Sequence, residues 1–268
     1  MGAAQTTAGS GPGYARRPDY RVDVETSPRL VRVVFGGEDI ARSEAALLMR
    51  ETAHTPVYYF PPSDVRMDLM APTERSTHCP FKGDASYWTI AVADRVAENA
   101  VWSYRDPYDE VAGIKDHVAF YWDEMDAWFE EDEEIFVHPR DPYKRVDAVR
   151  SRRAVEVVVD GVAVARSTDA RFLFETGLPT RYYLPREAIA GAELIVSDTS
   201  TSCPYKGTAA YYHLKVGDRV FDDLVWHYPE PLAECGKIKG LLCFFNERVD
   251  AIHVDGKPVA KVETRWSR

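Results

Sequence analysis

A segment of six residues combines an imidazole, a thiol and an ammonium group. Residues 78–83 are His-Cys-Pro-Phe-Lys-Gly. Adjacent imidazole and thiolate groups suit zinc, or serve as a base and a nucleophile. A lysine beside a glycine turn can hold a phosphate or a carboxylate with help from backbone N–H groups. We therefore predict catalytic candidates at His78, Cys79 and Lys82, with Lys82 holding an anionic group and His78 acting as acid or base.

Each of these residues also has a plainer interpretation. Free cysteine is among the most buried residue types, so Cys79 is a structural thiol, a nucleophile or a metal ligand. Structural zinc needs cysteine pairs about two to four positions apart, whereas Cys235 and Cys243 are eight positions apart. We therefore predict no metal site. Lys82 is either an exposed turn lysine or a ligand-binding lysine. It does not belong to a P-loop, because the motif G-x-x-x-x-G-K-[ST] is absent around it.

The motif occurs twice, which indicates an internal repeat. Cys79 and Cys203 are separated by 124 positions, and so are Lys82 and Lys206. The same offset joins three pairs of aromatic residues: Tyr58 and Tyr182, Trp102 and Trp226, and Tyr104 and Tyr228. A period of this length is too long for a solenoid unit and matches the usual size of a domain. The sequence therefore predicts two homologous domains in tandem.

The repeat also sets the expected domain boundaries. We expect a first repeat domain at residues 29–140 and a second at residues 152–268, joined by a linker at residues 141–151. A proline in the linker would stiffen it. Residues 1–28 begin with a stretch rich in Gly, Ala, Thr and Pro, and we expect them to form a disordered tail.

Short apolar and β-branched runs separated by turn signals make each repeat mainly β in character. Asp160-Gly161 and Asp255-Gly256 lie between such runs and predict tight hairpin turns. Residues 108–115 and 232–240 are the best candidates for a short helix. The acidic residues 130–134 indicate a solvated turn, with a metal-binding loop as the alternative. We predict two small β-barrel or β-tent-like domains, each with one short helix.

Aromatic residues at matching positions could form a core or the wall of a ligand site. Tyr and Trp fill cores, but they also turn their polar tips toward ligands. Strand alternation places Trp102 and Tyr104 on one face and Ser103 on the other. The ligand-binding candidates are Tyr58, Tyr59, Arg66, Trp88, Trp102, Tyr104, Cys203, Lys206, Tyr182, Trp226 and Tyr228.

The two repeats differ in their polar residues. Asp64, Arg66 and Asp68 of the first repeat are all replaced by alanine at the matching positions of the second, and Ser202 replaces His78. One interpretation is that the first repeat holds the functional pocket and the second a reduced one. The other is surface drift in the second copy.

Composition and charge exclude several classes of function. The chain of 268 residues has 43 acidic and 33 basic side chains, for a formal charge of −10. A nucleic-acid binder or a protein that docks on anionic lipid needs a basic face. No run approaches the roughly 18 apolar residues that span a bilayer, and residues 1–17 lack the apolar centre of a secretory signal. Four cysteines do not make a disulfide scaffold, so we expect a reduced, cytoplasmic protein.

Together these motifs resemble the bacterial domain-of-unknown-function 427 family. The segments that carry the resemblance are residues 58–61, 64–68, 77–88, 100–104 and 174–183, and the resemblance extends over about residues 29–264. It implies a compact β-rich fold of the β-tent or barrel-like kind. One label attached to the family is nucleotidyltransferase. Such enzymes need a Gly-Ser turn and paired acids, often Asp-x-Asp, to hold magnesium ions at the phosphates. In this sequence Asp-x-Asp is absent, and the sole Gly-Ser pair is Gly9-Ser10, in the N-terminal tail.

Three hypotheses about function follow. The first is a small-molecule site, binding or catalytic, in which Lys82, His78, Cys79 and Arg66 lie on an aromatic wall and take an anionic or aromatic ligand. The second is a non-enzymatic interaction module whose two repeats pack on each other. The third is phosphoryl or nucleotidyl transfer. The sequence does not identify a cofactor.

Overall fold

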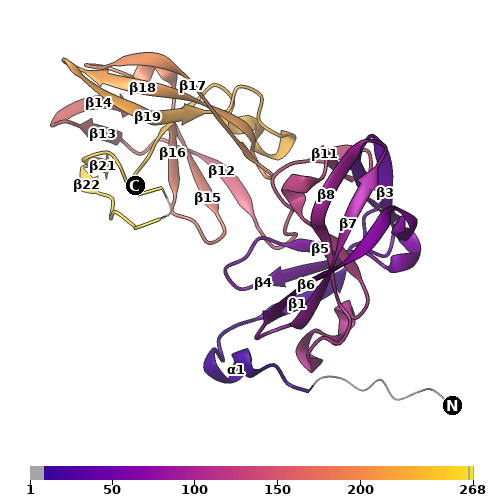
Figure 1. Ribbon diagram of the computed structural model, residues 1–268. Coiled ribbons are helices and arrows are strands. Elements are labelled where there is room, and N and C mark those ends of the chain that lie inside the picture. Colours follow the sequence, from indigo (N-terminus) through magenta and orange to yellow (C-terminus); the bar gives the residue numbers. More distant parts are fainter. Residues whose placement is uncertain (1–8, 265, 268) are drawn as a thin grey trace. The chain divides into compact units, whose positions relative to one another are not determined.

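The computed structural model describes residues 9–264, 266 and 267, and it confirms a tandem of two β-rich domains (Figure 1). The chain divides into two compact units, Met1–Asp141 and Pro142–Arg268. Each unit repeats the same arrangement of antiparallel strands. Among the described residues, no helix has the length and the apolar content needed to cross a membrane.

In the first unit, strands in the orders β1-β4-β5 and β6-β7-β8-β9 are joined by a bridge between Phe60 and Val118. A smaller sheet has the order β11-β10-β2-β3. The strands are β1 (Val22–Thr26), β2 (Val31–Phe35), β3 (Glu38–Ser43), β4 (Leu47–Glu51), β5 (Val57–Tyr59), β6 (Met70–Cys79), β7 (Gly83–Val92), β8 (Arg95–Tyr104), β9 (Val118–Phe120), β10 (Ala127–Glu130) and β11 (Glu133–Ile135). The helical segments are α1 (Pro12–Arg16) and the 3₁₀ turns η1 (Pro62–Asp64), η2 (Met67–Leu69), η3 (Asp109–Ile114) and η4 (Trp122–Glu124).

In the second unit, seven strands form one sheet of order β12-β15-β16-β20-β19-β18-β17, and four more have the order β14-β13-β21-β22. The strands are β12 (Val146–Ser151), β13 (Val155–Val159), β14 (Val162–Ser167), β15 (Ala170–Glu175), β16 (Arg181–Leu184), β17 (Glu193–Cys203), β18 (Gly207–Val216), β19 (Arg219–His227), β20 (Leu242–Phe244), β21 (Ala251–Val254) and β22 (Lys257–Pro258). The 3₁₀ turns are η5 (Arg186–Ala188) and η6 (Ala233–Ile238). Within the described part of the chain, neither sheet order closes on itself, so the units are open β structures rather than closed barrels.

The turn chemistry predicted from sequence is confirmed. Asp160 and Gly161 have φ of 53° and 73° between β13 and β14, and Asp255 and Gly256 have φ of 52° and 75° between β21 and β22. A type I′ turn, whose twist matches the right-handed twist of the flanking strands, requires positive φ at both of its central residues. The two predicted short helices lie at η3 and η6, where both form 3₁₀ turns.

The prediction of a disordered tail is wrong for residues 9–28, which contain α1 and β1. β1 pairs with β4 in register, and Val22 and Val24 pack against the buried cluster that includes Met49. The alternating apolar residues of β1 thus gain burial that the composition of the tail does not reveal. The remainder of the predicted tail, residues 1–8, lies outside the described residues.

Two separate cores cover the two faces of sheet β6–β9. Trp88 and Ile90 point to the core shared with the smaller sheet. Tyr87 and Tyr104 point the other way, into a cluster that η3 covers with Val111 and Ile114. This alternation follows from the two-residue period of a strand, and it determines which of the predicted site residues can meet.

Candidate functional site

A buried ion pair between a lysine and a glutamate occurs at the same place in each repeat. Lys82 donates to a carboxylate oxygen of Glu51, and Lys206 donates to Glu175 Oε2 over 2.5 Å. All four side chains are nearly buried, with exposed fractions of 11% and 6% in the first pair and 11% and 5% in the second. Removing two charges from water is costly unless they compensate each other, so each lysine is held in place by its glutamate.

The Cys-Pro-x-Lys-Gly turn positions the lysine. The Lys82 N–H donates to the Cys79 carbonyl over 3.2 Å, which closes the turn between β6 and β7. Gly83 has a φ of +99°, and a Cβ there would lie 3.2 Å from the Asp106 carbonyl oxygen. The glycine is therefore required by both its dihedral angle and the close approach of the following loop. Gly207 repeats this geometry, with a φ of +96°.

A tryptophan and a tyrosine are hydrogen bonded beside each pair. The indole N–H of Trp102 donates to the Tyr59 hydroxyl over 3.2 Å, and Trp226 donates to Tyr183 over 3.1 Å. Burial raises the pKa of Tyr104 above its ordinary value, and nearby Tyr59, Cys79 and Glu51 add to the effect. These phenols therefore stay protonated, and they can donate or accept hydrogen bonds without acting as bases.

The lysine of the second repeat remains an ammonium. Burial lowers the pKa of Lys206, but the neighbouring Cys203 and Glu175 outweigh burial, so that the pKa is raised overall. An amine must lose its proton to attack a carbonyl group. The pair therefore makes Lys206 a hydrogen-bond donor and a cation rather than a nucleophile.

The four thiols fall into two classes. Cys79 and Cys203 are half-buried beside the two lysines. Cys235 and Cys243 are buried, and burial raises their pKa values to about 11 and about 12. Because the thiolate is the reactive form, Cys235 and Cys243 are inert, and Cys79 and Cys203 are the thiols available for chemistry.

The structure does not bring His78 to the ion pair. His78 is adjacent to Cys79 on β6, so the two side chains point to opposite faces. The His78 ring is exposed, with Nδ1 at 2.6 Å from Asp84 Oδ1. A catalytic pair of His78 with Cys79, as expected from their adjacency in sequence, therefore has no geometric support.

Four other predicted residues also lie apart from the lysines. Arg66 is exposed and forms ion pairs with Asp68 and Glu38. Trp88 and Tyr58 belong to the core on the other face of the sheet. Tyr182 packs edge-to-face on Phe172 at 4.8 Å. The predicted residues that do gather at the two pairs are Lys82, Cys79, Tyr59, Trp102, Tyr104, Lys206, Cys203, Trp226 and Tyr228.

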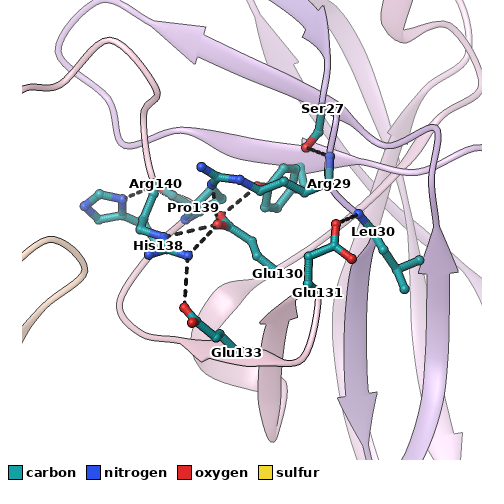
Figure 2. A network of polar contacts seen from close by, with 10 residues as sticks. Ser27, Arg29, Leu30, Glu130, Glu131, Glu133, His138, Pro139 and Arg140 are labelled. Carbon is teal, nitrogen blue, oxygen red and sulfur yellow. Dashed lines mark hydrogen bonds and ion pairs between the residues drawn. The ribbon is translucent and has the colours of Figure 1, made fainter. Parts of the chain in front are cut away.

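Tyr58 is part of a different polar network, centred on Glu130. Figure 2 shows Glu130 in this network with Arg29 and Arg140. The Glu130 side chain is 1% exposed, accepts a bond of 2.8 Å from the Tyr58 hydroxyl and pairs with Arg29 and Arg140. Glu130 is therefore buried, whereas residues 131–134, the rest of the acidic run, are exposed as expected for a solvated turn. The matching position in the second repeat is Val254, so this network is not duplicated.

The two glutamates and a further pair of residues lie at the site but were not predicted from the sequence. Glu51 and Glu175 keep the offset of 124 positions, so the repeat itself carried the signal. Tyr20 and Lys144 also keep this offset. The Tyr20 hydroxyl donates to Glu51 Oε1 over 2.5 Å, and Lys144 Nζ lies 3.2 Å from Glu175 Oε1.

A surface concavity of about 430 Å³ lies elsewhere, between β13, β14 and β21. Its two charged residues compensate each other, since Arg166 lies 2.6 Å from Glu156, and the His253 ring lies 3.5 Å from the same carboxylate. The first repeat has Arg32 in place of Glu156, so this cluster is not duplicated either. Among the described residues, no group of three or more His, Cys, Asp or Glu side chains could hold a metal ion.

Comparison with known proteins identifies one family. The model of a domain of unknown function (DUF427) matches residues 23–131 and, separately, residues 147–255. Each match covers the strands that carry one lysine–glutamate pair. No curated protein matches the chain.

Proposed function

The chain belongs to the DUF427 family as a tandem of two copies, and from this premise we propose that each repeat binds a small molecule at its lysine–glutamate pair. In the first repeat the site is formed by Lys82, Glu51, Cys79 and Tyr104. In the second it is formed by the matching residues around Lys206. The ligand is a small anionic or aromatic compound, because an ammonium and tyrosine hydroxyls converge beside an aromatic wall.

The observation that carries this proposal is the duplication of a buried charge pair. A well-packed apolar pair often stabilises a fold as well as a buried ion pair does. The fold therefore does not require Lys82 and Glu51, nor Lys206 and Glu175. Buried titratable groups that are held by a specific charge partner are characteristic of functional sites, and the presence of such a pair at the same place in both repeats supports a binding role.

The chemistry of the site favours recognition by hydrogen bonds. The lysine ammonium has three donors and its glutamate takes one. At Lys206 the Cys203 thiol is a further partner, and at least one donor remains for a ligand. Trp102 and Tyr104 lie on the same face of β8, where Tyr104 is buried in the cluster and Trp102 is partly exposed. Cys79, as a half-buried thiol, is the group of this set that can form a covalent bond with a bound ligand.

A ligand screen read out by thermal stability tests the proposal. The full chain is heated with nucleotides, sugar phosphates, aromatic acids and neutral aromatic compounds, one at a time. A true ligand at about a hundred times its Kd adds about 2.7 kcal/mol of stability. The hit is then measured by calorimetric titration against two variants that each have one pair replaced by apolar residues, Lys82→Met with Glu51→Leu and Lys206→Met with Glu175→Leu. A third variant combines all four substitutions and so lacks both pairs.

Lys239→Met is the matched control, because Lys239 pairs with Glu230 on the exposed surface. We expect the apolar variants to lose binding at the altered repeat and the control to keep it. An interaction module without a small-molecule site predicts no stabilising compound at all. That result, or binding that survives loss of both pairs, would overturn the proposal.

A further inference from the structure

One position beside the duplicated lysine–glutamate pair differs in charge between the two repeats. In the first repeat Tyr20 donates its hydroxyl to Glu51, which Lys82 also contacts. In the second repeat the matching residue is Lys144, whose ammonium lies 3.2 Å from Glu175 Oε1 while Lys206 occupies Oε2. The same carboxylate is thus shared by a cation and a neutral hydroxyl in one repeat, and by two cations in the other.

The two sites therefore differ by one unit of charge. Burial and Glu51 raise the pKa of Tyr20 above its ordinary value, so this phenol stays neutral. The charges of Lys82 and Glu51 then cancel, and the net charge of the first site is zero. The second site contains two ammonium groups against one carboxylate and has an uncompensated positive charge. A positive charge partly withdrawn from water attracts an anion more strongly than a fully solvated one.

A nearby carboxylate does not remove this difference. Glu234, in η6, lies close enough to raise the pKa of Cys235. Glu234 is exposed, however, and the first repeat has Glu110 at the matching position. Both repeats thus carry this charge, and Glu110 is in addition occupied by the Ser10 hydroxyl and the Gly11 N–H.

Access to the two positions also differs. Tyr20 is 6% exposed and stacks on Phe81 with ring centroids 3.8 Å apart. The segment that leads to it is fixed on the turn by a bond of 2.8 Å from the Gly13 N–H to the Pro80 carbonyl. The Lys144 side chain is 25% exposed and lies over the Tyr205 ring, 5.4 Å from its centroid. The Lys144 side chain is thus partly in contact with solvent, whereas Tyr20 is covered.

We propose that the second repeat binds a small oxyanion, a carboxylate or a phosphate, at Lys144 beside the Lys206–Glu175 pair. The first repeat, with Tyr20 at the matching position, selects an uncharged ligand. This inference rests on the proposed function, and it assigns the anionic ligand to one repeat and the aromatic ligand to the other.

Exchange of the single differing residue tests the inference. Wild type, Lys144→Tyr and the exposed-lysine control Lys239→Tyr are titrated with inorganic phosphate and, separately, with acetate, at constant ionic strength against chloride. We expect phosphate or acetate to bind to wild type and to the control, and Lys144→Tyr to weaken this binding by about tenfold or more. The stronger of the two anions identifies the oxyanion class. Near-ultraviolet circular dichroism checks that Lys144→Tyr remains folded.

Two results would overturn the inference. One is an oxyanion affinity equal in Lys144→Tyr and Lys239→Tyr, and the other is no preference for either oxyanion over chloride. A neutral ligand that still binds at the Lys82 pair under either result would leave the proposed function intact. Ligand binding that survives replacement of both lysine–glutamate pairs would instead contradict the proposed function itself.

Discussion

Lys82 and Glu51 are 31 residues apart in the chain and meet inside the first repeat as a buried ion pair. Glu51 is the last residue of β4, and Lys82 is the residue that precedes β7. The pair thus fixes the turn between β6 and β7 against a strand from another part of the sheet. Lys206 and Glu175 repeat the relationship with the same separation, so whatever the pair does is built into both repeats.

Breaking one pair should destabilise the protein, and more so in the first repeat. Lys82→Met leaves Glu51 buried with the Tyr20 hydroxyl as its remaining partner, and the expected loss is about 3–5 kcal/mol. Lys206→Met leaves Lys144 on Glu175, so its loss should be smaller. Urea unfolding followed by tryptophan fluorescence measures both.

The apolar double variant Lys82→Met with Glu51→Leu is the control for this experiment. Because it leaves no unpaired buried charge, it should recover most of the lost stability. A single variant as stable as wild type, or a double variant less stable than the single one, would show that the pair is not held as described.

Thiol labelling should separate the cysteines into two groups of two. In the folded protein at pH 8, Cys79 and Cys203 should react with a small alkylating reagent, because they are half-buried rather than buried. Cys235 and Cys243 should react after unfolding, since burial raises their pKa values to about 11 and about 12. Peptide mass spectrometry assigns each site. Early labelling of Cys243 in folded protein would contradict the burial of its thiol.

The repeat, the strand-rich fold and the turn chemistry could be predicted from sequence because each depends on local residue types. Asp160-Gly161 predicts its turn whatever lies around it, since both residues must have positive φ. The face on which Trp102 and Tyr104 lie follows equally from strand alternation. These features need no knowledge of contacts between distant segments.

The composition of the site could not be predicted in the same way. His78 and Cys79 are neighbours in sequence, but on a strand this places them on opposite faces. The partner of Lys82 comes from 31 residues away, and no local pattern marks Glu51. Tyr20 was hidden in a segment whose composition suggested disorder. The glutamates could have been found by applying the repeat offset to every acidic residue.

Stability at acid pH should depend on another buried pair, Arg181 with Glu247. Burial acts to raise the pKa of Glu247, but hydrogen bonds from Arg181 and Thr264 outweigh it, so the pKa is lowered overall from 4.5. A carboxyl group with a lowered native pKa stabilises the fold above its unfolded pKa. This contribution is lost as the pH falls below about 4.5 and through the native pKa.

Glu247→Gln should therefore reduce the melting temperature at pH 7 and flatten its decline between pH 5 and more acid conditions. Glu230→Gln is the control, because Glu230 is 82% exposed and its pair with Lys239 should contribute little. Calorimetric scans over the pH series measure both. If the melting temperatures of wild type and Glu247→Gln fell in parallel with pH, Glu247 would have the same pKa in the folded and the unfolded protein, contrary to this prediction.

Substituting the glycine after each site lysine should disturb the site through the backbone. Gly83 and Gly207 have φ of +99° and +96°, and an added Cβ would lie 3.2 Å and 3.1 Å from the carbonyl oxygens of Asp106 and Glu230. Alanine at either position should cost about 1–3 kcal/mol. The loop that follows β8 or β19 would have to move, and the lysine would lose its alignment with the glutamate.

Gly113→Ala and Gly236→Ala are matched controls in η3 and η6, where an added Cβ meets no atom within 4 Å. We expect both controls to melt within about 1 °C of wild type, whereas Gly83→Ala and Gly207→Ala should melt earlier by about 3 °C for each kcal/mol lost. If a ligand is found, Gly83→Ala should also weaken its binding to the first repeat, because the turn positions Lys82. Normal melting together with normal binding in Gly83→Ala would mean that the turn does not position the lysine.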